Sequence, residues 1–220
     1  MAENNRTTGS LILVPALITL IITLLRLYGE LHNWSPLFFN RSAGGGFAIV
    51  GISWLPAIFG PYFAVKLAHA GSGPTSTGKS FLFTLVGFAI IFVGGYVAFG
   101  GGPGGVSARS IGGYALMLVG ALVTAAGWPA LTKTLFAYGY AARIPVAIIM
   151  YFAIAGTWGT HYDGLPPGYP TDVTFWTKYI GIGLLPQLVF WIVYTVFVGS
   201  LFGDIVATIA GRGKTAAQAA

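Results

Sequence analysis

The sequence predicts an all-α, polytopic integral membrane protein that forms a bundle of six transmembrane helices. Of its 220 residues, 55% are hydrophobic and only 7% are charged, and the mean hydropathy is +0.79. Soluble domains carry roughly 25% charged residues, so these charges are too few to cover a water-exposed surface. Such high hydrophobicity also excludes intrinsic disorder, and a polytopic membrane protein is the class that remains.

The six spans are placed on long uncharged runs, because a helix needs about 20 mostly apolar residues to cross the bilayer. The runs are continuously apolar, whereas β-barrel strands alternate, so helices are favoured. We expect one transmembrane domain over residues 1–220, with short polar tails at 1–9 and 212–220. The spans are predicted near residues 11–28, 46–67, 81–99, 112–132, 143–158 and 179–203.

The first span is expected to be a retained membrane anchor. It is long, and no small-x-small cleavage pattern follows it before Arg26 and Glu30, so it is unlike a secretory signal. In the fifth span, the aromatic residues from Phe136 to Tyr140 could extend the helix backwards as a tilted or interfacial turn.

The second and sixth spans carry a related pattern that ends in proline. Residues 51–56 (GISWLP) match residues 181–186 (GIGLLP) at four of six positions. Because a proline within a helix removes a backbone hydrogen bond and produces a kink, two such helices could line a cavity near the membrane centre, as in transporters. A chance match in a chain rich in Gly, Ile and Leu is the alternative. The expected cavity-lining residues are Ser53, Pro56, Pro186 and Gln187.

Small residues recur every four or seven positions on several predicted helices. Such stripes let two helix backbones approach closely within lipid. Packing inside the bundle is the simpler interpretation, and contact with a second copy or another membrane protein is the alternative. The stripes are Gly60, Ala64 and Ala68; Gly94, Ala98 and Gly102; Gly113, Gly120 and Gly127; and Gly199, Gly203 and Ala207.

The orientation is predicted from Lys and Arg, which are enriched on the cytoplasmic side of membrane proteins. The side that holds both termini carries more of them, so both termini are expected in the cytoplasm and the protein in the plasma or inner membrane. Tryptophans and tyrosines gather on the opposite side, as an interfacial belt would. The first side has Arg6, Lys66, Lys79, Lys133, Arg143, Arg212 and Lys214, and the other has Arg26, Arg41, Arg109 and Lys178.

The segment from Gly73 to Ser80 (GPTSTGKS) satisfies the phosphate-loop pattern G-x-x-x-x-G-K-[ST]. That chemistry requires a loop between a buried parallel strand and a helix, together with an acidic residue for Mg²⁺. Here the flanking segments are predicted membrane helices, and no acid lies between Arg41 and Tyr162. We therefore expect no nucleotide binding. Lys79 and Ser80, at a cytoplasmic helix N-terminus, form a candidate site for a phosphate or a lipid headgroup.

A polar cluster is predicted on the outer side. Glu30 and His32 end the first span, and His161, Asp163 and Asp172 lie in the loop before the sixth. Glu-x-His and His-x-Asp could together supply nitrogen and oxygen ligands to Zn²⁺ or a similar ion, or could support acid–base chemistry. The alternative is an ordinary proline-stiffened loop, in which Glu30 pairs with the arginine four residues before it.

The few charges are expected at helix ends rather than within the bundle, including those of Glu30 and Asp204. That arrangement disfavours proton-coupled carriers, and the lack of histidine inside the predicted spans disfavours a haem protein. The chain has no cysteine, which excludes disulfides and thiolate metal sites.

Three functions are compatible with these observations, none of them with an assigned catalytic residue or cofactor. The first is a non-catalytic accessory, lipid-interacting or structural membrane component. The second is a small permease or channel for a neutral solute, lined by the second and sixth spans. The third is a membrane-embedded enzyme or metal site on the outer face. The lipid bilayer is the expected partner, and nucleic acid is not.

Overall fold

The computed structural model describes residues 8–46, 48–102 and 106–219, with side chains up to Ala210. The described part is all-helical and has no strand, as the sequence predicts. Short elements connect the long helices: the 3₁₀ turns η1 (Ala43–Gly45) and η2 (Thr124–Ala126), the helix α6 (Phe175–Lys178), and two π-helical segments, η3 (Tyr179–Leu184) and η4 (Pro186–Phe190). The long helices are α1 (Thr8–Leu31), α2 (Leu55–His69), α3 (Thr77–Phe99), α4 (Ala108–Val123), α5 (Pro129–Gly156) and α7 (Trp191–Ala219).

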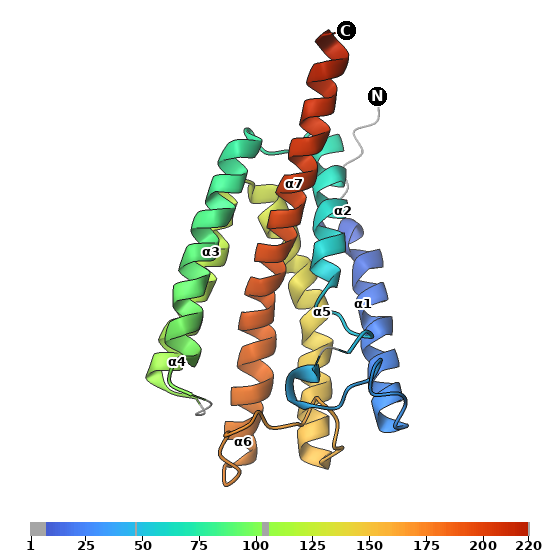
Figure 1. Cartoon of the computed structure of the whole chain (residues 1–220), viewed down its shortest axis with the longest axis vertical. Helices are drawn as coiled ribbons and strands as arrows, with labels where there is room; N and C mark the ends of the chain where they lie inside the picture. The colour runs from blue at the N-terminus through green and yellow to red at the C-terminus, as the bar shows by residue number, and fades with distance from the viewer. Residues whose placement is uncertain (1–7, 47, 103–105, 220) are drawn as a thin grey trace.

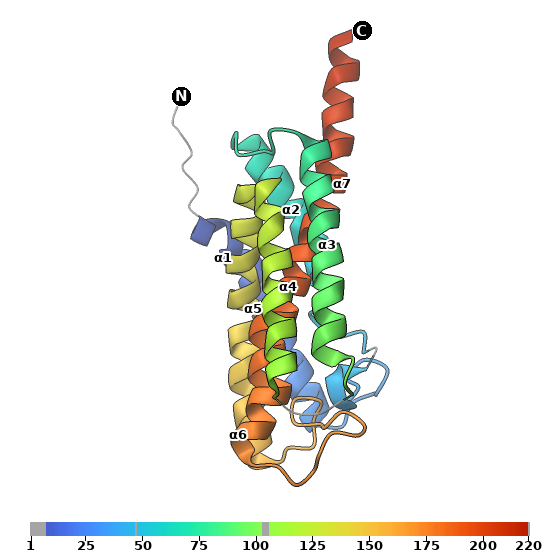
Figure 2. The same ribbon diagram turned by 90° about the vertical axis from the view of Figure 1, so that its left-hand side faces the viewer.

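The helices form one bundle with α7 at its centre. Helices α3 and α4 pair on one side, α1, α2 and α5 lie on the other, and α7 runs between the two groups (Figure 1). Helix α1 begins and α7 ends at the same end of the bundle. The connections α1–α2, α3–α4 and α5–α6 lie at the opposite end, named here the loop end (Figure 2).

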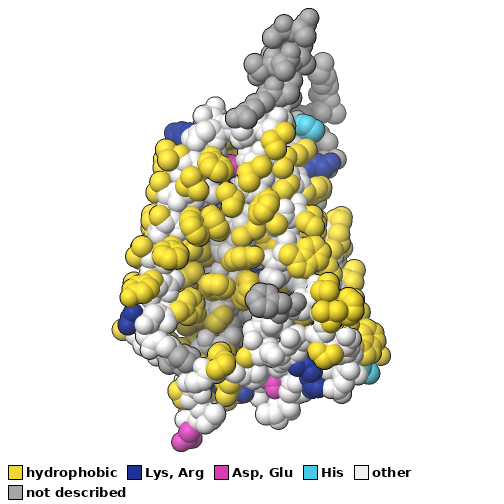
Figure 3. All heavy atoms as spheres, in the orientation of Figure 1, with side chains coloured by type: hydrophobic (Ala, Val, Ile, Leu, Met, Phe, Trp, Pro, Cys, Tyr) yellow, Lys and Arg dark blue, Asp and Glu magenta, His cyan; other side chains and the backbone are white. Residues whose placement is uncertain are grey.

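The surface of the bundle fits a membrane protein. Large apolar side chains such as Leu13, Phe92, Tyr96 and Ile148 point outward and are more than half exposed. On the face drawn in Figure 3, hydrophobic side chains cover the middle of the bundle, and most charged ones lie near its two ends. Within the described residues, five segments are long and apolar enough to cross a bilayer: Thr8–Leu31, Thr77–Phe99, Ala108–Ala126, Pro129–Gly156 and Phe175–Ala210.

Glycines of the predicted stripes contact one another inside the chain. A methyl group on Gly60 of α2 would overlap the carbonyl oxygen of Gly199 on α7. On the other side of the bundle, a methyl group on Gly94 of α3 would lie 2.8 Å from the carbonyl oxygen of Gly113 on α4. These close crossings require glycine, because any side chain would separate the two backbones. These glycines are therefore occupied by packing within the chain rather than presented to a partner.

Helix α2 begins later than the second predicted span, at Leu55 instead of residue 46. Pro56 lies in its first turn, where the missing backbone N–H would have had no helical partner in any case. The prediction that Pro56 kinks the middle of a span is therefore wrong, because this proline starts the helix. At 1.5 Å per residue the 15 residues of α2 extend about 22 Å, less than the roughly 30 Å of hydrocarbon that a full span crosses.

Pro186 lies inside a continuous helical path, between the two π-helical segments. The backbone N–H of Leu185 donates to Ile180, and that of Trp191 donates to Pro186, both with the five-residue spacing of a π-helix. Such wider turns are uncommon and often occur at functional sites. The helical path is thus longer than the sixth predicted span at both ends, since it runs from Phe175 to the end of α7. The segment around Pro186 is π-helical.

Helix α5 begins much earlier than the fifth predicted span. Trp128 precedes the helix, and Pro129 occupies its first turn, which is a favoured position for proline. The fourth predicted span is correspondingly shorter and ends in η2. As a result Arg143, which the sequence analysis places at a helix end, lies in the middle of a 28-residue helix.

Candidate functional site

A cavity of about 760 Å³ lies towards the loop end of the bundle. Its walls come from α1, α3, α4, α5, the π-helical stretch and the start of α7, and the three loops of the loop end contribute the rest. Pockets for small molecules commonly have volumes of roughly 300–1,000 Å³ and mostly apolar walls. This cavity fits that description, since apolar residues including Ile22, Ile52, Val146, Met150, Ile182 and Phe190 line much of it.

The most unusual residue of the cavity wall is Arg143, whose exposed fraction is only 5%. Its Nη1 donates to Oε1 of Gln187 at 3.3 Å, and its guanidinium carbon lies 4.4 Å from the centre of the Trp191 ring. Within the described residues the ion pair joins Glu30 to Arg26, with His161 hydrogen-bonded to the same carboxylate, so no carboxylate pairs with Arg143. The expectation that the bundle interior lacks charge is therefore wrong.

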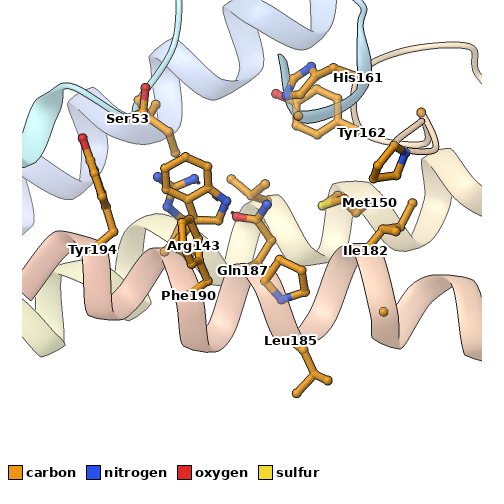
Figure 4. Close-up of a pocket in the computed structure, with 18 of the residues that line it drawn as sticks. Ser53, Arg143, Met150, His161, Tyr162, Ile182, Leu185, Gln187, Phe190 and Tyr194 are labelled. Atoms are coloured by element: carbon orange, nitrogen blue, oxygen red, sulfur yellow. Dashed lines mark hydrogen bonds between the residues drawn. The ribbon is translucent and has the colours of Figure 1, made fainter. Parts of the chain in front are cut away.

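Polar side chains surround this arginine in the cavity. Arg143 projects from α5 and Gln187 from η4 towards the same side, on which Ser53 lies (Figure 4). Tyr162 and His161, which belong to the α5–α6 loop, occupy the facing wall (Figure 4). Ser53 is exposed and lines the cavity, so it marks the entrance on the α1–α2 connection.

A buried ion pair joins α1 to the loop that covers the cavity. Nε of Arg26 donates to Oε1 of Glu30 at 2.8 Å, and the Glu30 side chain is fully enclosed. His161 donates to the same carboxylate from its ring and from its backbone. Arg26 also donates to the carbonyl oxygens of Asn40 and Gly45, which ties the α1–α2 connection to the same group.

The α5–α6 loop is held in shape by Asp163. Its carboxylate accepts hydrogen bonds from the backbone N–H groups of Gly159 and Thr160, at 2.8 and 2.7 Å, and from the Thr160 hydroxyl at 2.7 Å. The preceding residue, Tyr162, lines the cavity and donates its hydroxyl to the carbonyl of Thr23 at 3.3 Å. Burial raises the pKa of Tyr162, so its hydroxyl keeps its proton near neutral pH.

The structure brings together only part of the predicted outer cluster. Glu30 and His161 are in contact, and Asp163 lies nearby with its carboxylate engaged in its own turn. His32 faces outward, where its ring stacks on Tyr28 and bonds to the Tyr28 carbonyl. Asp172 is exposed. Among the described residues no group of three His, Asp or Glu side chains could hold a metal ion.

Three of the four predicted cavity residues line the cavity: Ser53, Pro186 and Gln187. Pro56 does not line it, because it lies at the start of α2. Sequence reasoning missed Arg143 as a buried charge in the cavity wall. The signal that could have found it is the pair Trp128–Pro129, since a proline after a break is typical of a helix start. A helix from that point places Arg143 about four turns inside.

The candidate headgroup site at Lys79 and Ser80 is only partly present. Lys79 is exposed at the start of α3. The Ser80 hydroxyl instead points into the bundle and donates to Asp204 at 2.6 Å, and Thr84 donates to the other oxygen of that carboxylate at 2.8 Å. Asp204 is therefore a buried, hydrogen-bonded carboxylate within α7, and its prediction as a helix-end charge is wrong because α7 continues to Ala219.

The chain matches no protein-family model, no curated protein and no solved structure. Its function is therefore inferred from the cavity and from the charges around it.

Proposed function

We propose that the protein is a membrane permease for a small organic solute, and that the cavity at the loop end is its binding site. The observation that supports this function is a cavity of about 760 Å³ with a few polar groups set in apolar walls, inside a helical bundle with an apolar surface. Such a cavity favours a binding role over a purely structural or accessory one. The separation of His32 and Asp172 from Glu30 and His161 weighs against a metal enzyme.

In this proposal the solute enters from the loop end, because Ser53 is exposed and lines the cavity there. That end faces the outside if both termini are cytoplasmic. The charge asymmetry supporting this orientation persists when the two interior arginines, Arg26 and Arg143, are left out. Lys66, Lys79 and Lys133 then remain on the terminal side with the basic residues of the two tails, against Arg41, Arg109 and Lys178 on the other.

The absence of native cysteine makes access to the cavity directly measurable. Ser53→Cys introduces one thiol at the entrance, and Ser200→Cys introduces one at a buried position of α7 as a matched control. We expect a membrane-impermeant thiol reagent, added to intact cells, to modify Ser53→Cys and to leave Ser200→Cys unmodified. If Ser53→Cys is also unreactive in purified protein, the cavity is closed to water and the proposal fails.

Transport itself is tested in proteoliposomes. Uptake of a labelled panel of organic acids, amino acids, sugars and alcohols is measured before and after a bulky thiol reagent is attached to Ser53→Cys. We expect at least one class to enter faster than in protein-free vesicles, and attachment at the entrance to stop that uptake. Equal rates with and without protein for every class would contradict a permease.

A further inference from the structure

Arg143 carries a buried charge that the protein does not neutralise. Burying an ionised group is costly unless it is paired with an opposite charge or well hydrogen-bonded. A guanidinium has five N–H donors, and among the described residues only Gln187 accepts from this one. The face of Trp191 provides a partial, cation–π compensation at 4.4 Å. The remaining donors lie in the cavity wall without an acceptor among the described residues.

The other charges near the cavity do not supply the missing anion. Glu30 is shared between Arg26 and His161, and Nη2 of Arg26 is bonded to two backbone carbonyls. The Asp163 carboxylate is bonded within its own turn. Asp204 belongs to a separate cluster with Ser80 and Thr84, towards the other end of α7. One positive charge is therefore left over in the cavity wall.

We infer that Arg143 binds the carboxylate of an organic monoanion whose apolar body occupies the rest of the cavity, an assignment that rests on the proposed permease function. One unpaired guanidinium matches one negative charge, and its planar donors suit the two oxygens of a carboxylate. Gln187 adds to the site, because its oxygen accepts from Arg143 and its NH₂ group is left to donate to the ligand.

The apolar walls define the rest of the ligand. Ile52, Val146, Met150, Ile182 and Phe190 form much of the cavity wall, and the second arginine that lines the cavity, Arg26, is already paired with Glu30. A sugar acid or a dicarboxylate would leave hydroxyls or a second carboxylate against these side chains, at a cost. The ligand class is therefore an aliphatic or aromatic monocarboxylate. It replaces the neutral solute expected from the sequence.

The test compares three eight-carbon probes with purified full-length protein: octanoate, octanamide and octylamine. Binding is measured by calorimetry and by protection of Ser53→Cys from a thiol reagent. We expect octanoate to bind, and octanamide and octylamine to bind about 10- to 100-fold more weakly because they lack the charged acceptor. Equal binding of octanoate and octanamide would overturn the assignment while leaving a permease for neutral solutes intact. If no probe and no member of the uptake panel protects Ser53→Cys or is transported, the proposed function fails instead.

Arg143→Met tests the residue, and Arg109→Met is its matched control at an exposed arginine that does not line the cavity. The methionine removes the charge and leaves no unpaired donor of its own, so the variant should fold at least as well as the wild type. We expect octanoate binding to weaken about 10- to 100-fold in Arg143→Met only, with octanamide binding unchanged. Undiminished octanoate binding by Arg143→Met would overturn the inference. Should this variant fail to fold, Gln187→Leu provides the second test, because it should weaken octanoate more than octanamide.

A carboxylate could reach the cavity from water or from the bilayer. Octanoate in buffer represents the first source, and hexadecanoate incorporated in lipid nanodiscs represents the second. If either probe binds the wild type but not Arg143→Met, the assignment is supported, and the probe that binds identifies the source. Failure of both to bind protein that is otherwise folded and transports another solute would overturn it.

Discussion

His161 and Glu30 are joined by two hydrogen bonds that connect the α5–α6 loop to the end of α1. The ring Nδ1 of His161 donates to Oε1 of Glu30 at 2.5 Å, and the backbone N–H of His161 donates to Oε2 at 2.9 Å. Arg26 donates to Oε1 from one turn earlier on α1. A single enclosed carboxylate thus fixes the loop that covers the cavity, and its removal should affect both helix and loop.

Replacing Glu30 with glutamine should lower the free energy of unfolding by about 3 kcal/mol, because the change leaves the buried Arg26 without an opposite charge. The measurement is chemical unfolding in detergent micelles, followed by tryptophan fluorescence. Asp172→Asn is the control, since it makes the same chemical change at an exposed position and should alter stability by less than about 0.5 kcal/mol. Equal effects of the two substitutions would mean that the ion pair does not stabilise the fold.

The stability of the protein should fall as the pH falls below about 6.5. Burial lowers the pKa of His161 below its ordinary value of 6.5, against the opposing effect of Glu30. The unfolded chain therefore takes up a proton that the folded chain resists, so the stability contributed by neutral His161 is present above pH 6.5 and is lost towards the lowered pKa. The charged groups around the ring are Glu30, Arg26 and Asp163.

This pH dependence is measured as the melting temperature between about pH 7.5 and about pH 5. His161→Asn should flatten the profile, because an amide can donate to Glu30 but does not titrate in this range. His32→Asn should leave the profile unchanged, since that ring lies outside the bundle. If the melting temperature of the wild type depends on pH in the same way as that of His161→Asn, the assignment of a buried neutral histidine is contradicted.

The crossing of α2 and α7 should not accept even one methyl group. Gly60→Ala would drive its Cβ into the Gly199 carbonyl oxygen, and the contact is with backbone that cannot rotate away. We expect a loss of about 1–3 kcal/mol or failure to assemble, measured as the yield of monodisperse protein in size-exclusion chromatography. Gly95→Ala is the matched control on α3, because a Cβ there meets nothing within 4 Å. A normal yield from Gly60→Ala would show that the helices can separate.

Asp163→Ala should loosen the α5–α6 loop without unfolding the bundle. The substitution leaves the N–H groups of Gly159 and Thr160 without their acceptor, a cost of about 1–3 kcal/mol for the buried Thr160 donor. We expect faster proteolytic cleavage between α5 and α6 in the variant. Asp172→Ala lies in the same connection and should be cleaved at the wild-type rate, so similar rates for the two variants would argue against this role of Asp163.

The apolar runs of the sequence were enough to predict an all-α bundle, but not where its helices begin. A run of uncharged residues includes irregular segments as well as helix, and residues 46–54 belong to such a run while α2 starts at Leu55. The opposite error occurs at Arg143. A charged residue in an apolar run is read as the end of a span, whereas the chain buries this one in mid-helix. Only the packing around it, by Gln187 and Trp191, accommodates the charge.

The structure brings together one pair of the predicted polar cluster and separates His32 and Asp172 from that pair. Glu30 and His161 lie at the same end of the bundle, as the alternation of the spans requires, and they do meet. His32 follows Glu30 by two residues, and positions two apart on a helix face different directions. Asp172 lies far along a loop whose path no periodicity could reveal. Contacts between loop residues depend on tertiary structure, and no periodic pattern in a single sequence predicts them.

The shortness of α2 has a consequence for the membrane itself. In the proposed membrane protein, a helix of about 22 Å would leave the remaining depth of the bilayer at that point to irregular backbone, which lipid tolerates only where protein or water satisfies its polar groups. The Arg26 guanidinium bonds two of those carbonyls, and the cavity lies beside them. Lipid tails next to this segment would meet a local constriction of the hydrocarbon layer, so a thinner bilayer should suit this protein better than a thicker one.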